Sequence, residues 1–181
     1  MIVFLLIAIA ASLVFMSTAR KVSSSDIGNP NVAAFLAMIR HCEIGERYSN
    51  PYNVYYGGKI FSNTSDHPVN TGECQRVITK WGTTSAAGAY QFEVATWNGL
   101  GGKDRYGDFG PGAQDMAATE LIAQTGALDD VENGNFFAAV QKVGHLWASL
   151  PSSTSGQPSH TWDEVALVYG NAGGTIGDSL A

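Results

Sequence analysis

The chain has 181 residues, of which 45% are hydrophobic and 14% are charged. This length and composition are typical of one globular domain with its own core, and they exclude a disordered chain. The formal net charge of -6 and the isoelectric point near 5.0 offer no basic surface to a phosphate backbone, so we expect no nucleic-acid partner.

The first segment, residues 1–19, carries no charge and consists mainly of Ile, Leu, Val, Phe and Ala. As a helix rising ~1.5 Å per residue it would reach about 28 Å, close to the ~30 Å of bilayer hydrocarbon. We therefore expect an N-terminal transmembrane helix, acting as an anchor or signal-anchor. The alternative is a cleaved signal peptide, but no basic region precedes the apolar run. Arg20 and Lys21 follow it, and the positive-inside rule would then hold the domain in the cytoplasm, so the orientation stays open.

The next segment, residues 20–31, contains the serine, asparagine, glycine and proline residues of a flexible linker. Asn31 can then cap a helix. One face of this helix is apolar and carries Phe35, Leu36, Ile39 and Cys42. Glu43 stands at the end of that face. The chain is thus expected to divide into an anchor at 1–19, a linker at 20–31 and a catalytic domain at 32–181.

A short β-hairpin is expected directly after this helix. An aromatic stretch at 52–56 precedes two glycines and a further strand at 59–61, the pattern of two antiparallel strands joined by a glycine turn. Helical spacing of apolar residues recurs in four later segments, at 88–99, 112–125, 135–148 and 161–170. The predicted fold class is therefore α+β, a mainly helical domain with one small antiparallel hairpin, preceded by the transmembrane helix.

Seven short segments in chain order resemble a known protein family. They are AFLAMIRHCE (34–43), YNVYYGGKIF (52–61), SDHP (65–68), AAGAYQF (86–92), AQDMAATELI (113–122), LWASLP (146–151) and NAGGTI (171–176). In this order they resemble the lambda-type phage endolysins, which are lytic transglycosylases of the lysozyme-like superfamily. The resemblance covers about residues 32–176 and implies a lysozyme-like fold for that region.

The resemblance also implies a substrate and a reaction. The substrate would be the glycan strand of peptidoglycan, whose β-1,4 bond from MurNAc to GlcNAc breaks without water and leaves 1,6-anhydro-MurNAc. Glu43 stands at the position of the catalytic acid, which must hold its proton near neutral pH, and burial raises the pKa of a carboxyl in that direction. The same group, once ionised, can accept the proton of the C6 hydroxyl. The alternative for Glu43 is an ordinary surface acid at a helix end.

Six residues are candidates for substrate binding under this resemblance. They are Tyr52, Asn53, Gly88, Tyr90, Gln91 and Trp147. Packing or capping roles are the alternative for Tyr52, Tyr90, Gln91 and Trp147. The family carries aspartate where Asn53 stands, glycine where Ala86 stands and arginine where Ala89 stands.

The missing aspartate bears on the type of reaction. A hydrolytic glycosidase usually needs a second carboxylate, so its absence weakens a hydrolytic mechanism. Glu46 and Asp66 could supply that group, although ordinary exposed loop charges are the alternative for both.

No metal or cofactor is expected, because no pair among the four histidines and two cysteines has the spacing of a metal site. Cys42 and Cys74 can either form a disulfide or remain two separate buried thiols. The Ser- and Gly-rich stretch 151–160 matches a mobile lip over the cleft in the family.

The predicted function is that of a peptidoglycan lytic transglycosylase, used in host-cell lysis or in wall penetration at entry. With residues 1–19 in a membrane, the enzyme would lie at the host inner membrane facing the periplasm, or in the virion. Two other functions stay open. One is a hydrolytic muramidase, and the other is a catalytically inactive glycan-binding virion protein, suggested by Asn53, Ala86 and Ala89.

Overall fold

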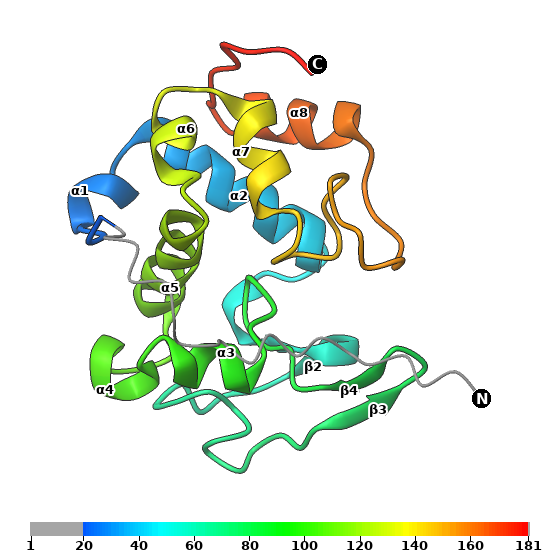
Figure 1. Cartoon of the computed structure of the whole chain (residues 1–181). Helices are drawn as coiled ribbons and strands as arrows, with labels where there is room; N and C mark the ends of the chain where they lie inside the picture. Colours follow the sequence, from blue (N-terminus) through cyan, green and yellow to red (C-terminus); the bar gives the residue numbers. More distant parts are fainter. Residues whose placement is uncertain (1–19, 181) are drawn as a thin grey trace.

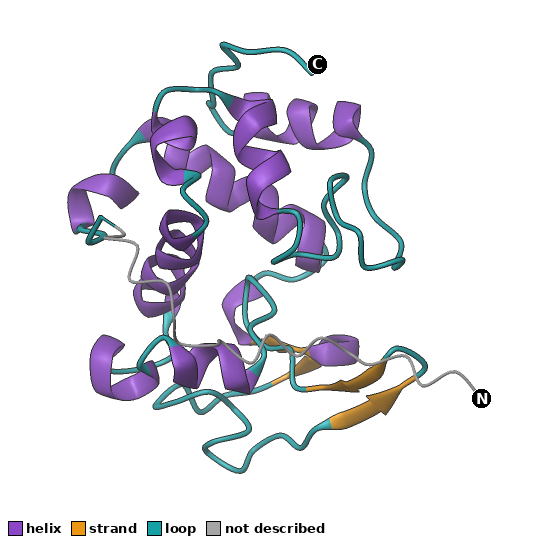
Figure 2. Ribbon diagram, viewed as in Figure 1, coloured by secondary structure: helices purple, strands orange, loops and turns teal. Residues whose placement is uncertain are grey.

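A computed structural model describes residues 20–180 (Figure 1). The helices are α1 (Ser24–Ile27), α2 (Pro30–Ile44), α3 (Val94–Gly99), α4 (Gly102–Tyr106), α5 (Pro111–Gln124), α6 (Leu128–Glu132), α7 (Phe136–Val143) and α8 (Trp162–Asn171). The strands are β1 (Val54–Tyr55), β2 (Lys59–Ile60), β3 (Val77–Thr79) and β4 (Gly82–Thr84), and two 3₁₀ turns lie at η1 (Pro51–Asn53) and η2 (Tyr56–Gly58). Helices α6, α7 and α8 gather around α2 at one end, and α3, α4 and the strands lie at the other (Figures 1 and 2). The described residues thus form a mainly helical α+β fold.

Two antiparallel hairpins form the small sheets. In the first, Val54 pairs with Ile60 and Tyr55 with Lys59, so the predicted hairpin is present. Its connection is the three-residue turn η2 rather than a two-glycine turn. The second hairpin, β3 with β4, was not predicted, because its strands are three residues long and carry no alternating apolar pattern.

The N-cap of helix α2 lies two residues earlier than the predicted cap, Asn31. The cap is Asn29, whose Oδ1 accepts hydrogen bonds from Asn31 N at 2.9 Å and Val32 N at 3.4 Å. Pro30 then occupies the first helical position, where its missing N–H costs nothing. The apolar face of the helix is almost fully buried and includes Val32, Phe35, Leu36, Met38 and Ile39. This burial, worth about 1.5–3 kcal/mol per large side chain, fixes the helix and the last turn that carries Glu43.

Phe109 lies at the centre of a cluster of aromatic side chains. The Phe109 ring is 4.8 Å from the centre of Trp97, 5.0 Å from His67 and 6.0 Å from Phe61. His67 is completely buried; its Nε2 lies 3.0 Å from Phe92 O and its Nδ1 accepts from a backbone N–H. Burial lowers the pKa of His67, so the neutral imidazole braces this loop.

The predicted transmembrane helix, and the membrane-anchored localisation that depended on it, need a correction. Across residues 20–180, every helix is too short or too polar to cross a bilayer. Residues 1–19, on which that prediction was made, lie outside the described residues.

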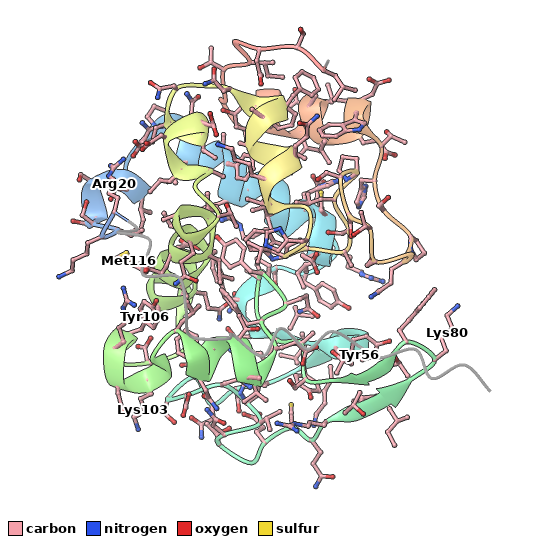
Figure 3. The ribbon with its side chains drawn as sticks, viewed as in Figure 1. Arg20, Tyr56, Lys80, Lys103, Tyr106 and Met116 are labelled. Carbon is pink, nitrogen blue, oxygen red and sulfur yellow. The ribbon has the colours of Figure 1, made fainter. Side chains whose placement is uncertain are left out.

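The segment expected to be a flexible linker contains ordered structure. Helix α1 lies within it, and the Arg20 guanidinium forms ion pairs with Asp26, with Glu132 at 2.7 Å and with Asp129 at 3.1 Å (Figure 3). These pairs attach the start of the described chain to α6.

Candidate active site

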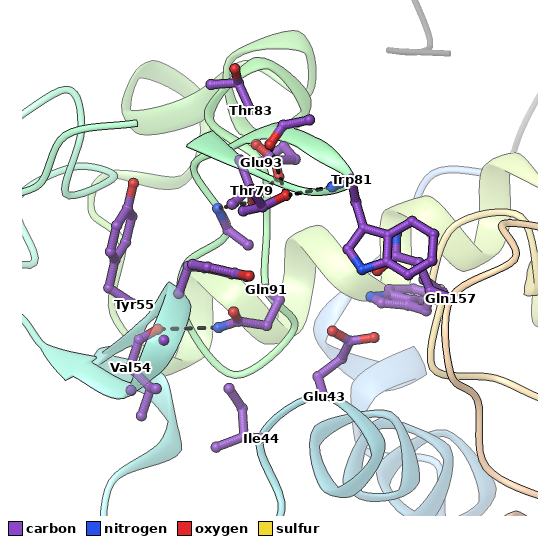
Figure 4. Close-up of a pocket in the computed structure, with 18 of the residues that line it drawn as sticks. Glu43, Ile44, Val54, Tyr55, Thr79, Trp81, Thr83, Gln91, Glu93 and Gln157 are labelled. Carbon is purple, nitrogen blue, oxygen red and sulfur yellow. Dashed lines mark hydrogen bonds between the residues drawn. The ribbon is translucent and has the colours of Figure 1, made fainter. Parts of the chain in front are cut away.

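A groove of about 510 Å³ opens beside the C-terminal end of α2 (Figure 4). Its walls come from the end of α2 and the residues that follow it, from both hairpins, from the loop at 86–93 and from residues 146–157. Segments distant in sequence therefore converge on one concave surface, which is the usual form of a ligand site.

Glu43 reaches into this groove from the last turn of α2 (Figure 4). Burial raises the pKa of its carboxyl to about 7, and the hydrogen bonds from Ser149 act in the opposite direction. The C-terminal end of a helix also carries partial negative charge, which disfavours a carboxylate there. Ser149 Oγ donates to Glu43 Oε1 at 2.5 Å. Near neutral pH this carboxyl can therefore both give up and take back a proton.

Gln91 presents its side-chain amide to the same groove. Its Nε2 donates to Gly88 O at 2.9 Å and to Val54 O at 3.2 Å. The backbone of Gln91 has φ +48°, a conformation that residues with a Cβ rarely adopt. The two hydrogen bonds hold the amide at the groove wall despite that strain.

Gly88 supports the loop from behind the groove. It has φ +77°, and a Cβ at this position would lie 2.1 Å from Gln114 Oε1. That buried amide accepts from Ala89 N at 2.8 Å and donates to Phe109 O at 2.8 Å and Tyr52 O at 3.0 Å. Gly88 is therefore required for the approach of Gln114, and it does not line the groove.

Tyr52 and Tyr90 meet in a polar cluster away from the groove. Both hydroxyls donate to Asp115 Oδ1, at 2.9 Å and 2.5 Å respectively. The Arg40 guanidinium, from α2, donates to the Tyr90 hydroxyl at 2.8 Å. Ala89, at the position where the family carries arginine, is fully buried. Arg40 thus supplies the cation of this cluster from another element.

Asn53 and Trp147 also have structural partners. Asn53 Nδ2 donates to Phe61 O at 3.0 Å, and the residue does not line the groove. Trp147 does line it, but its Nε1 donates to Tyr90 O at 3.1 Å and only 4% of the residue is exposed. Among the residues predicted from sequence, the structure brings Glu43, Gln91 and Trp147 to the groove, whereas Tyr52, Asn53, Gly88 and Tyr90 do not line it.

The proposed second carboxylates lie elsewhere, and a different one lines the groove. Glu46 is exposed, 3.3 Å from His41 Nδ1, and Asp66 accepts from Trp97 Nε1 at 2.8 Å. Neither of them lines the groove, whereas Glu93 does.

The Glu93 carboxylate accepts from Thr84 Oγ1 at 2.5 Å, Ser85 Oγ at 2.5 Å and Ser85 N at 2.8 Å. Sequence reasoning missed Glu93, Ser149, Tyr56 and Trp81, all of which lie at or beside Glu43 or line the groove. Ser149 and Tyr56 lie within two of the seven segments that resemble the family, at 146–151 and 52–61, but no sequence pattern marked either residue as part of a site.

No metal site is found in the part of the chain that the structure describes, residues 20–180, where no group of three or more His, Cys, Asp or Glu could hold an ion. Cys42 and Cys74 are both free thiols, so the structure favours the second of the two alternatives for this pair.

Comparison with known proteins places these features in a family. The family model described as Endolysin matches residues 33–176. The endolysin of Escherichia phage P2 is 34% identical over 154 residues, covering 80% of this chain and 93% of the relative. The endolysin of Escherichia phage lambda is 32% identical over 125 residues, covering 69% and 77% respectively.

Solved structures agree with these sequence matches. Bacteriophage lambda lysozyme complexed with a chitohexasaccharide superposes with a TM-score of 0.72 at 30% identity, covering 82% of this chain and 97% of that chain. A further structure of the bacteriophage lambda lysozyme gives a TM-score of 0.69 at 29% identity over the same shares of the two chains.

Proposed function

The chain belongs to the endolysin family, phage enzymes that degrade peptidoglycan, and we propose that it does so as a lytic transglycosylase. The substrate is the MurNAc–GlcNAc strand, and the bond cleaved is the β-1,4 link from MurNAc C1 to GlcNAc. The observation that carries this proposal is the Glu43 carboxyl, with a pKa of about 7, inside the groove. The chitohexasaccharide complex of the lambda lysozyme supports a β-1,4-linked amino-sugar chain as the ligand.

Glu43 serves in turn as acid and as base. The protonated carboxyl donates its proton to the glycosidic oxygen, and the bond from that oxygen to MurNAc C1 breaks as positive charge develops on the ring. The Glu43 carboxylate then accepts the proton of the MurNAc C6 hydroxyl while its oxygen bonds to C1. The proton returns to Glu43, the products are a new GlcNAc hydroxyl and a 1,6-anhydro ring, and no water is consumed.

Ser149 assists the ionised stage of this cycle. Its hydroxyl donates to Glu43 Oε1 at 2.5 Å, and a hydrogen bond to a carboxylate is stronger than one to a neutral carboxyl. It therefore stabilises the form that exists between the two proton transfers, and keeps the pKa from rising further through burial.

A second candidate, a hydrolytic muramidase, is favoured by one observation, which is that the Glu93 carboxylate lines the same groove. A carboxylate there could activate water or stabilise the charged ring. Three donors already engage Glu93, which favours a supporting role for it under the first proposal.

Product analysis separates the two reactions. Purified peptidoglycan is digested with the full chain and the released fragments are analysed by mass spectrometry. The transglycosylase gives anhydro fragments ~18 Da lighter than the hydrolytic products, because no water is added. Glu43→Gln should abolish release, and Glu46→Gln, which alters an exposed carboxylate outside the groove, should not. Fragments with reducing ends that disappear in Glu93→Gln would replace the first proposal with the second.

A further inference from the structure

Among the described residues, the exposed Phe, Tyr and Trp side chains are confined to the groove. Within 20–180, the large hydrophobic side chains left exposed include two aromatic ones, Tyr56 at 39% and Trp81 at 41%. Both line the groove. The exposed aliphatic ones do not line it, and they are Ile60, Ile78, Leu167, Ile176 and Leu180. Because an exposed ring gives up the free energy of burial, its restriction to a concave surface points to a ligand.

The turn at the tip of the second hairpin fixes the backbone of Trp81. Thr79 Oγ1 donates to Gly82 O at 2.8 Å and accepts from Trp81 N at 3.0 Å, which closes the turn between β3 and β4. Gly82 has φ +118°, which favours glycine at this position. Because this turn fixes its backbone, Trp81 loses less conformational freedom when its ring binds a ligand.

A lysine ammonium lies over one face of the Trp81 indole. Lys80 Nζ lies 5.0 Å from the centre of the Trp81 ring, and Lys80 does not line the groove. Figure 3 shows Lys80 at the outer edge of the molecule, and Figure 4 shows the Trp81 indole at the groove, on the side where Gln157 lies. The indole lines the groove with 41% of the residue exposed, so part of the ring is available to a ligand there.

The polar side chains around these rings identify the chemical class of the ligand. Gln91, Glu93, Thr83 and Gln157 line the same groove, so hydrogen-bonding groups alternate with the aromatic faces. A pyranose ring has the same alternation, with C–H groups on its faces and hydroxyl or acetamido groups at its edge. A purely apolar ligand would displace water from polar side chains such as Thr83 and Gln157 without replacing its hydrogen bonds.

We propose that Trp81, with Tyr56 as a second platform, forms a stacking subsite that binds pyranose rings of an amino-sugar chain. This inference rests on the proposed function and adds a specificity element to it. The subsite holds the strand while Glu43 acts on the bond. Stacking of this kind is the same before and during bond cleavage, so it lowers KM and leaves kcat unchanged.

The test measures binding of chitohexaose to the full chain carrying Glu43→Gln, which prevents turnover, by isothermal titration calorimetry. Trp81→Ala should weaken binding roughly threefold to tenfold, the range expected for one aromatic contact. Trp81→Phe should retain most of the affinity because it keeps a ring. Ile78→Ala, on the same hairpin but outside the groove, should bind like the parent, and Tyr56→Ala should be weakened. On peptidoglycan, Trp81→Ala alone should raise KM without changing kcat.

Two results would overturn the subsite. Equal affinity of Trp81→Ala and Ile78→Ala would mean that the ring makes no contact with the sugar. Equal loss in Trp81→Ala and Trp81→Phe would mean that an aromatic face is not what the ligand recognises. If the unmodified chain still releases anhydro fragments in either case, only the subsite fails. If affinity depends on Trp81 but no anhydro fragment forms, the transglycosylase fails and the subsite stands.

Discussion

Glu43 is a residue whose buried setting costs folding stability near neutral pH. Its pKa is about 7 in the folded chain and close to the ordinary 4.5 when unfolded. The folded state therefore binds the proton more tightly. The stability that this protonation contributes is fully present below about pH 4.5, and it is lost as the pH rises through about 7.

We predict that Glu43→Gln becomes more stable than the parent chain as the pH rises. The two should unfold at similar denaturant concentrations at pH 4, since the folded parent is then protonated and neutral like glutamine. Above pH 7 the variant should be more stable by on the order of 1 to 3 kcal/mol, a figure reduced for the partial exposure of the side chain. Urea denaturation across this pH range measures the difference, and a constant gap at all pH values would show that the carboxyl is not perturbed.

Ser149→Ala should move the pH dependence of activity upward. The serine hydroxyl stabilises the carboxylate, so removing it raises the pKa of Glu43 further. Since the acid form starts the reaction, the alkaline fall in kcat/KM should begin at a correspondingly higher pH. The half-buried Ser153, which donates to Ser155 Oγ and forms no hydrogen bond with Glu43, supplies the control variant Ser153→Ala. A profile for Ser149→Ala that coincides with that control would contradict the role given to Ser149.

At the residue scale, the sequence pointed to Glu43, which lines the groove in the structure, but not to the residues around it. Its place at the end of an apolar helical face, with the family resemblance, was enough to single it out. The exposure of each aromatic residue was harder to predict, because no sequence pattern separates Tyr90 from Trp81. In the structure Tyr90 is 1% exposed and Trp81 is 41% exposed. Which ring is available to a sugar depends on long-range packing, such as the Asp115 bond that holds Tyr90.

The loop at 86–92 is the element that sets the groove wall, and Gly88 is its critical position. Gly88→Ala should destabilise the chain by about 2–4 kcal/mol, combining left-handed strain with displacement of the buried Gln114 amide. Gly72 is the matched control, with φ +78° but no atom within 4 Å of an added Cβ. Gly72→Ala should cost only about 1 kcal/mol. Equal shifts of the two thermal midpoints would contradict the packing role of Gly88.

Element boundaries followed the sequence where local signals were complete. Helix α8 starts at the Thr161–Glu164 capping box and α5 starts at Pro111, both within one residue of the periodic pattern. The helix predicted at 88–99 begins only at Val94, because Gly88 and Gln91 have positive φ and cannot belong to a right-handed helix. The helix predicted at 135–148 ends at Val143, since the chain turns at Gly144 against Ser152. Such tertiary contacts override periodicity.

At the scale of the whole molecule, folding does not depend on a disulfide. Cys42 and Cys74 are free, and burial raises the pKa of the Cys42 thiol to about 12. After denaturation, alkylation should add two groups per chain with or without reductant, as measured by mass. Addition of a reductant should also leave the thermal midpoint unchanged. Alkylation that requires the reductant would contradict free thiols.

The membrane prediction was made from composition alone, and no helix of residues 20–180 supports it. It was drawn from the hydropathy of residues 1–19, which lie outside the described residues. The helices of residues 20–180 bury their apolar faces against one another, as α2 does against α6 and α8. The lysozyme-like fold predicted for residues 32–176 was confirmed by the family match and by the superposition on the lambda lysozyme. This prediction rested on seven segments in chain order, all of which had to be compatible with one fold.

The central claim, that Glu43 holds its proton near neutral pH, can be measured directly. The chain is labelled with ¹³C at the glutamate side-chain carboxyls, and the Glu43 resonance is assigned from its absence in Glu43→Gln and followed through a pH titration. We predict a midpoint of about 7, well above those of exposed glutamates. A midpoint near the ordinary 4.5 would leave the groove without an acid at neutral pH and would contradict the mechanism.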